Sequence, residues 1–263
     1  MPSNRHWTAF ADDTGDPGAA GTEHFGYAVL AVERSNMRHI TQIAAEFRVK
    51  HEMFLEAKAW IGSPRFQDLI SKVSSACNSG VILTGASILR KANYQGPYLR
   101  DTAQAPRDPH FLRNFCVRHA LEVLFADVAF EERDTLELVL DRVEYSDKQI
   151  LNLRDYLNSV YAKEGAFPFP RLKHVTHASS SYVEGLQIAH HLAELAHRVH
   201  MLADPDPAEL ARAFLRIKTL VSSRDFVLDP KAREGMGREG RGVRQNEERG
   251  PESTISAHPP PPD

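Results

Sequence analysis

Cysteine is scarce in this chain of 263 residues. It occurs only as Cys77 and Cys116, which lie far apart and lack the spacing of a metal site. We therefore expect no disulfide framework, and a reducing cytoplasm is the expected compartment. No apolar run is long enough to span a bilayer, and the N-terminus has no apolar signal region, so we expect no association with a membrane.

Signatures of two large enzyme classes are missing as well. The chain has no Gly-x-x-x-x-Gly-Lys loop, which disfavours a nucleotide-hydrolysing ATPase, and no Gly-x-Ser-x-Gly turn, which disfavours a serine hydrolase. The formal net charge of -3 gives no overall basic surface for nucleic acid but leaves room for a local basic groove. A hydrophobic content of 42% is sufficient for a sizeable core.

The order of the predicted elements indicates an α/β domain with a mixed sheet. A strand ending at Asp12 and a strand over residues 25–32 are close enough in sequence to form a hairpin. Further strands are predicted over 80–89, 136–141 and 172–176, and helices from Ser35, from Ser63-Pro64, from Asp108 or Pro109, and over 145–161, 185–202 and 206–221. Residues 228–263 are rich in Arg, Gly, Glu and Pro, which predicts a disordered tail after a domain over 1–227.

Two predicted strands are followed by an aspartate: Trp-Thr-Ala-Phe-Ala by Asp12, and Leu-Glu-Leu-Val-Leu by Asp141. If these strands are parallel neighbours, the two carboxylates lie close together and repel each other unless a cation lies between them. Oxygen ligands of this kind suit Mg²⁺ or Mn²⁺, the ions of metal-assisted phosphodiester hydrolysis. Both residues also have a structural interpretation: Asp12 shapes a turn, and Asp141 accepts hydrogen bonds from nearby backbone amides.

Several short motifs together resemble a known family. Asp12-Asp13-Thr14-Gly15-Asp16, Glu56-Ala57-Lys58, the strand ending at Asp141, and Gly185-Leu186-Gln187-Ile188-Ala189 occur in the order found in the domain-of-unknown-function family numbered 3800. The resemblance covers residues from about 7 to about 200. It implies a ribonuclease H-like fold and a metal-dependent nuclease, often linked to mobile elements or phage defence, with nucleic acid as the expected partner.

The resemblance also implies roles for individual residues. Asp12, Asp13 and Asp141 would be the catalytic acids, and Lys58 would contact a phosphate or a developing charge. Thr14, Glu56 and Gln187 would contact the substrate. Glu56 and Lys58 are equally consistent with an exposed surface pair.

One position departs from the family pattern. The acid expected after Gln187-Ile188-Ala189 is replaced by His190, and the Asp-Ser expected before that helix is lost within His177-Ala178-Ser179-Ser180. A neutral imidazole binds Mn²⁺ or Zn²⁺ but is a poor ligand for Mg²⁺. The site then holds a softer metal, or Glu194 one turn later supplies the carboxylate, or the protein is inactive. His190, Glu194 and His197 share one helix face, which is also typical of a solvated polar surface.

The sequence therefore leaves two functions open. One is a nuclease or phosphodiesterase that uses Mg²⁺ or Mn²⁺, with Asp12, Asp141, His190 and Glu194 as candidate metal ligands. The other is a catalytically silent ribonuclease H-like module that binds nucleic acid or a partner protein. The convergence of Asp12, Asp141 and either His190 or Glu194 on one point distinguishes them. The sequence does not determine the oligomeric state.

Overall fold

A computed structural model describes residues 4–18, 21–51, 62–94, 99, 109–141, 152–159, 169–201, 211–212, 214–220 and 226–227. These residues all belong to one compact unit, Met1–Val227. The tail predicted for residues 228–263 lies outside the described residues, as do Glu56 and Lys58. None of the described helices is long and apolar enough to cross a membrane.

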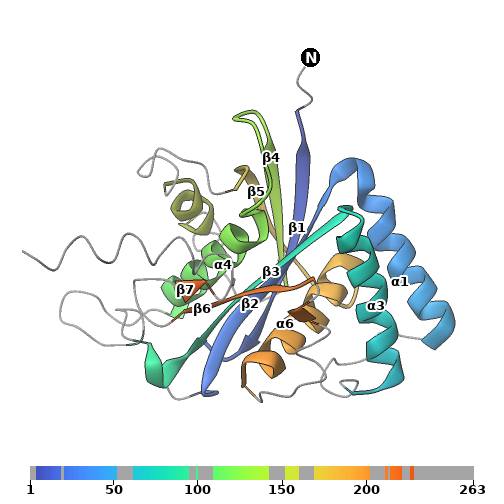
Figure 1. The fold of residues 1–263 in the computed structure, drawn as a ribbon. Helices are drawn as coiled ribbons and strands as arrows, with labels where there is room; N and C mark the ends of the chain where they lie inside the picture. Colours follow the sequence, from blue (N-terminus) through green and yellow to red (C-terminus); the bar gives the residue numbers. More distant parts are fainter. Residues whose placement is uncertain are drawn as a thin grey trace, which may run out of the picture. The chain divides into compact units, whose positions relative to one another are not determined.

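The described strands form one mixed sheet in the order β5-β4-β1-β2-β3-β6-β7 (Figure 1). The strands are β1 (His6–Gly15), β2 (His24–Glu33), β3 (Ile82–Arg90), β4 (Thr135–Asp141), β5 (Arg171–Ala178), β6 (Arg216–Leu220) and β7 (Phe226–Val227). The hairpin of β1 and β2 and the pair of β2 and β3 are antiparallel, whereas β4 pairs parallel with both β1 and β5. The predicted hairpin is thus confirmed.

Helices cover both faces of this sheet. They are α1 (Met37–His51), α3 (Pro64–Asn78), α4 (Pro109–Phe125) and α6 (Glu184–Met201), with short 3-10 turns at Arg34–Asn36 and Lys91–Asn93 and a helical segment at 152–159. Helices α1, α3 and α6 share one hydrophobic cluster with the sheet, and α4 shares the other (Figure 1). The α/β class predicted from the sequence, a mixed sheet flanked by helices, is confirmed.

Local sequence explains where several elements begin and end. Ser63 caps α3, because its hydroxyl oxygen accepts a hydrogen bond from the Phe66 backbone N–H at 3.2 Å, and Pro64 follows in the first turn. Gly15 ends β1 with a φ of 83°, and a side chain there would collide with the carbonyl of His24. In β4, Leu136, Leu138 and Leu140 alternate with partly exposed residues, as expected of a strand covered by a helix on one face.

The helix predicted over 206–221 is wrong in its second half. Residues 211–212 are helical, but Arg216–Leu220 forms β6, which pairs in parallel with β3. The buried positions of β6 are Lys218 and Leu220. Because one of them is a charged residue, the sequence lacks the apolar–polar alternation that would predict a strand. Pairing with the open side of β3 decides the outcome.

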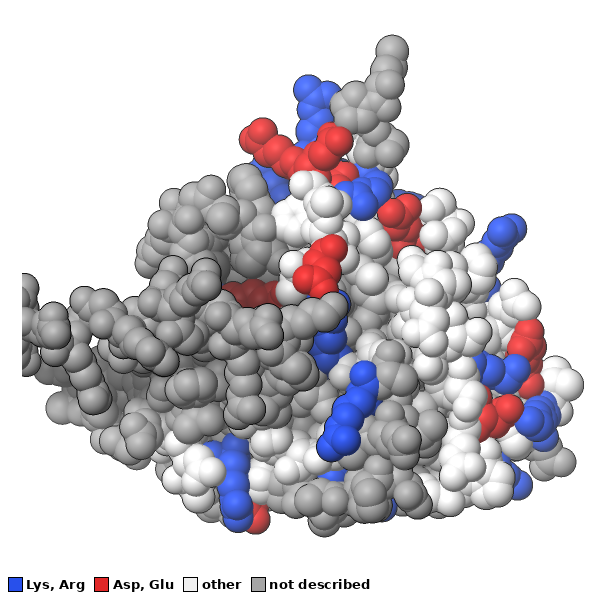
Figure 2. Space-filling view, in the orientation of Figure 1, with Lys and Arg blue, Asp and Glu red and all other residues white. Residues whose placement is uncertain are grey.

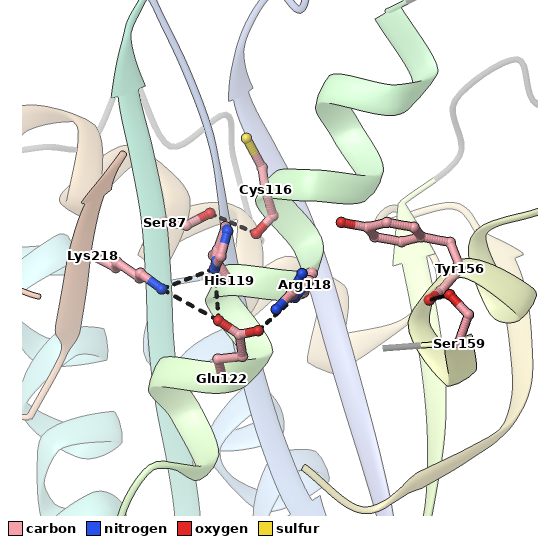
Figure 3. A network of polar contacts seen from close by, with 8 residues as sticks. All are labelled: Ser87, Cys116, Arg118, His119, Glu122, Tyr156, Ser159 and Lys218. Carbon is pink, nitrogen blue, oxygen red and sulfur yellow. Dashed lines mark hydrogen bonds and ion pairs between the residues drawn. The ribbon is translucent and has the colours of Figure 1, made fainter. Parts of the chain in front are cut away.

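Lys218 is accommodated by a charged network between β6 and α4 (Figure 3). Its Nζ donates to Glu122 Oε2 at 3.3 Å and lies 2.9 Å from Nδ1 of the buried His119. Arg118 Nε donates to the other Glu122 oxygen at 2.6 Å, and His119 Nδ1 lies 2.7 Å from Oε2. Burial alone would raise the pKa of Glu122, but the His119 hydrogen bond and the charges of Lys218 and Arg118 lower it to about 2.

We predict that Glu122→Gln destabilises the protein by about 3 kcal/mol at neutral pH, since it removes the carboxylate that pairs with the buried Lys218. Because the folded pKa is about 2 and the ordinary value is 4.5, this contribution is present above pH 4.5 and is lost as the pH falls toward 2. Urea denaturation as a function of pH measures it. Glu46→Gln, which removes an exposed pair with Lys72, is the matched control and should change little. Equal stability of the two variants at pH 7 would contradict the prediction.

Candidate active site

Two aspartates meet where the parallel pairing of β1 and β4 ends. The last paired rung joins Ala11 to Leu140, so Asp12 and Asp141 occupy the next position on each strand. Residues at paired positions of a parallel sheet share a face, and both carboxylates therefore lie on the face that carries α6. The prediction that β1 ends at Asp12 is wrong, because its pairing with β2 continues to Gly15. The pairing with β4 is what stops at this level.

Asp12 is buried beside a histidine of α6. The residue is 4% exposed, and its Oδ2 lies 2.7 Å from Nδ1 of His190. Its Oδ1 accepts the backbone N–H of Asp13 at 2.8 Å. Burial raises the pKa of Asp12; the hydrogen bond and charge of His190 oppose this, and the nearby Asp141 charge adds to it. The structure thus places His190 in contact with Asp12, and Asp141 close enough for its charge to act on Asp12.

Asp141 is held by the turn that joins β5 to α6. Its Oδ1 accepts the backbone N–H of Ser180 at 2.7 Å, and its Oδ2 accepts the Ser180 hydroxyl at 3.1 Å. This double contact fixes the carboxylate at the end of β4, where Asp141 also pairs with Ala178 of β5. Ser180 lies in the segment where the family pattern has an Asp-Ser pair.

Gln187, which the resemblance assigns to substrate, is engaged with protein atoms. Its Oε1 accepts a hydrogen bond from Arg48 Nη2 at 3.0 Å, and its Nε2 donates to the Ser181 carbonyl at 3.3 Å. Arg48 of α1 also pairs with Glu184 at the start of α6. Arg48 and Gln187 thus stabilise the turn at Ser181. The preceding residue, Ser180, binds Asp141. No sequence motif marks Arg48, because its partners are more than a hundred residues away.

Asp13 lies on the opposite face of β1 from Asp12, as strand alternation requires. Burial and the Asp12 charge raise its pKa to about 6, and the opposing charge of Arg113 on α4 lowers it. Like Arg48, Arg113 acts on a candidate site residue, and no motif in the sequence indicated it. Thr14 is buried on the same face as Asp12, two residues further along β1.

Glu194 lies one turn beyond His190 on α6, where Arg198 Nε donates to Glu194 Oε1 at 3.4 Å. His191 next to His190 is buried, which lowers its pKa to about 4, and its Nδ1–H donates to the Gln187 carbonyl at 2.8 Å. His197 packs against His24 of β2 with ring centres 6.0 Å apart. Of the four candidate metal ligands, Asp12 and His190 are therefore in contact, and the charge of Asp141 acts on Asp12.

The donor set is suited to a divalent cation that keeps most of its water. Among the described residues, no three His, Cys, Asp or Glu side chains are arranged around one ion position. Mg²⁺ in proteins commonly takes one or two carboxylates, with waters and substrate phosphates completing its shell. Asp12 and Asp141 supply two such carboxylates. The charge of Asp141 raises the pKa of Asp12, and a bound cation would offset this repulsion.

Comparisons with known proteins concern the fold alone. No family model matches the chain, and a comparison with curated proteins gives no match. Among solved structures, the chain is similar to the ribonuclease H2 from Pyrococcus horikoshii OT3, with 12% identity and a TM-score of 0.46 over 76% of this chain and 77% of that chain. It is also similar to a chain of the PCNA:RNase HII complex from Archaeoglobus fulgidus, with 13% identity and a TM-score of 0.42 over 94% and 98% of the two chains. At these TM-scores, nothing about the site is inferred from either similarity.

The close approach of α6 to β1 depends on Gly185. A Cβ atom added there would lie 2.4 Å from the ring of Phe10, which projects from β1 on the same face as Asp12. The rigid aromatic ring in the core cannot move aside without disturbing its neighbours. Gly185 therefore sets the distance at which α6 presents His190 to Asp12.

We predict that Gly185→Ala lowers the free energy of unfolding by about 1–3 kcal/mol, because the added methyl group overpacks the contact with Phe10. Urea denaturation followed by circular dichroism measures the change. Gly18→Ala is the matched control, since its added methyl group would meet only the terminal carboxylate of the exposed Asp16, at 2.9 Å. A Gly185→Ala protein as stable as the Gly18→Ala protein would show that α6 does not pack this tightly.

Proposed function

We propose that this protein is a divalent-metal-dependent phosphodiesterase that acts on nucleic acid, with Asp12 and Asp141 as the carboxylates that hold the cation. The observation that supports this proposal is the adjacent pair of carboxylates on one face of the sheet, one of them buried and with a raised pKa. Two adjacent carboxylates destabilise the folded state unless a bound cation offsets their repulsion. Acids with strongly shifted pKa values gather at functional sites.

The residues of the site have separate roles in the proposed reaction. Asp12 and Asp141 hold the cation, which supplies activation of a water molecule and stabilisation of the leaving oxygen. His190 orients Asp12 through the 2.7 Å contact, and Ser180 orients Asp141 through its N–H and hydroxyl. The resemblance also gives Asp13 a catalytic role, but its side chain lies on the opposite face of β1 from Asp12, so it has no step in the proposed reaction.

The remaining assignments follow the sequence resemblance. Lys58 would contact a phosphate, Glu56 and Thr14 would contact the substrate, and Glu194 would serve as a reserve ligand one turn from His190. The choice between Mg²⁺ and Mn²⁺ and a role in mobile elements or phage defence also belong to this proposal. Arg48 and Gln187 act through Ser180 and Asp141, so they are positioning residues.

A second function is favoured by a different observation. Each oxygen of Asp12 and Asp141 already has a donor within hydrogen-bond distance: Asp13 and His190 for the first, Ser180 for the second. A pair satisfied in this way can remain folded without a cation. The protein would then be a catalytically silent module that binds nucleic acid or a partner protein. A carboxylate oxygen carries a second lone pair, so these contacts are also compatible with metal binding.

We predict that the purified protein cleaves labelled DNA, RNA or an RNA–DNA hybrid in Mn²⁺ or Mg²⁺ and not in EDTA. Asp12→Asn and Asp141→Asn should each reduce the rate about 100-fold or more, because loss of a cation ligand removes several kcal/mol of transition-state stabilisation. Both variants should also lose the increase in melting temperature that Mn²⁺ gives the parent protein.

The control for this experiment is Asp127→Asn, which removes an exposed aspartate paired with Arg216 on another part of the surface. It should cleave at the parental rate. Cleavage that survives both Asp12→Asn and Asp141→Asn would rule out the proposed metal mechanism. Absence of cleavage and of any Mn²⁺-dependent rise in melting temperature would favour the silent module.

A second prediction concerns His190. We expect the parent protein to prefer Mn²⁺, because a neutral imidazole beside the carboxylates is a poor ligand for Mg²⁺. His190→Asp should shift the preference toward Mg²⁺ by about tenfold in relative rate. His190→Gln, which keeps a polar side chain without the added charge, is the control and should not produce this shift. An unchanged ratio of Mg²⁺ to Mn²⁺ rates in His190→Asp would exclude His190 from the metal environment.

A further inference from the structure

A large open concavity lies far from the aspartate pair. It has a volume of about 880 Å³ and opens at the edge of the sheet where β4 and β5 begin. The lining residues come from the turn before β4, from the first residue of β4, from the helical segment at 152–159 and from β5: Glu132, Arg133, Thr135, Arg154, Asp155, Asn158, Arg171, Leu172 and Lys173. We call this concavity the basic basin.

The basic basin is lined by four cations and by two acids, Glu132 and Asp155. Arg133, Arg171 and Lys173 are exposed and form no ion pair with any described residue, while Arg154 pairs only with its neighbour Asp155. Elsewhere on the described surface, pairing is common, as in the contacts Lys50–Asp68, Lys72–Glu46 and Arg216–Asp127. An excess of positive charge at a concavity of a chain with net charge -3 indicates a binding site for an anion.

The beginning of β4 lies beside the N-terminal residues, because the backbone N–H of Thr135 donates to the Arg5 carbonyl at 3.0 Å. Figure 2 shows charged side chains of both signs gathered at the end of the molecule where Figure 1 labels the N-terminus. The acids there include Asp134, which is buried and bonded to Arg5. Asp134 is therefore not available to neutralise the cations of the basin.

The strands β4 and β5 connect the basic basin to the aspartate pair. Thr135 pairs with Arg171 at the basin, and Asp141 pairs with Ala178 at the other end of the same two strands. Six residue steps along β4 span about 20 Å, at about 3.3 Å per residue. That distance equals about six nucleotides of a strand in a duplex, at about 3.4 Å each.

We propose that the basic basin binds the backbone phosphates of a nucleic-acid strand about six nucleotides from the position held at Asp12 and Asp141. This inference rests on the proposed function, and it specifies how the substrate is gripped. Arginine matches phosphate because its planar guanidinium donates two parallel hydrogen bonds, and the two strands of the edge fix Arg171 and Lys173 on one side of the basin. Phosphate contacts position a strand without reading its bases.

The test measures binding separately from cleavage. The combined variant Arg133→Gln, Arg171→Gln and Lys173→Gln is compared with the parent protein in Mn²⁺, by fluorescence anisotropy with uncleavable phosphorothioate hairpins whose stems are about 4 to about 16 base pairs long. We expect affinity to fall about tenfold for stems longer than about six base pairs and to stay unchanged for shorter ones. The dependence of log K on log salt should become shallower by about 2 to 3, one for each phosphate that the variant no longer binds.

The matched control removes the same charge elsewhere. Arg34, Arg38 and Arg212 are also exposed and without an ion pair among the described residues, and none of them lines the basin. Their combined change to Gln should leave the length dependence intact. Equal weakening by both triple variants, or no weakening by the basin variant, would overturn the proposal. So would tighter binding of an acidic peptide than of an oligonucleotide of the same charge, which would assign the basin to a protein partner.

Cleavage in Mn²⁺ is measured in parallel, so that the two proposals fail in different ways. Basin-dependent binding without cleavage overturns the phosphodiesterase and leaves the basin standing. Cleavage with no effect of the basin variant on binding overturns the basin alone. A parent protein that binds no strand of any length overturns both.

Discussion

The parallel pairing of β1 with β4 is the constraint on which the site depends. Backbone hydrogen bonds fix Ala11 opposite Leu140, and the next residue on each strand is then an aspartate on the same face. The chain has no freedom to separate the two carboxylates without breaking this ladder. Their mutual repulsion and the burial of Asp12 are therefore built into the fold, and neighbouring groups must offset them.

The offsetting groups come from one continuous stretch of chain. After β5, the turn at Ser180 supplies two donors to Asp141, and α6 then carries His190 to Asp12. Gly185 permits the helix to approach the ring of Phe10 closely enough for this contact. Gln187 of α6 donates a hydrogen bond to the carbonyl of Ser181 in this turn, so the elements that hold the two aspartates are bonded to each other. A change in the position of α6 would therefore act on both carboxylates.

The strands β4 and β5 carry opposite charges at their two ends. Asp141 lies at the carboxyl end, beside Asp12, whereas Arg171 and Lys173 lie at the amino end of β5, with Arg133 before β4. Helix α6 packs against β1 and β2, and β5 lies at one edge of the described sheet. A polyanion lying along these strands would meet cations at one end and the carboxylate pair at the other, where a bound divalent cation would reverse the local charge.

Elements whose signals are local could be predicted from the sequence. The apolar runs predicted β1 to β5, the Ser63-Pro64 pair predicted the start of α3, and the positions directly after two apolar runs marked Asp12 and Asp141. The tertiary structure decided what depends on distant partners. Arg216–Leu220 is a strand, because it pairs with the open edge of β3 and Glu122 binds Lys218. His190 contacts Asp12, and Gln187 binds Arg48. Local propensity and periodicity are properties of a few neighbouring residues, whereas the charge that a buried side chain meets is supplied by segments far away in the chain.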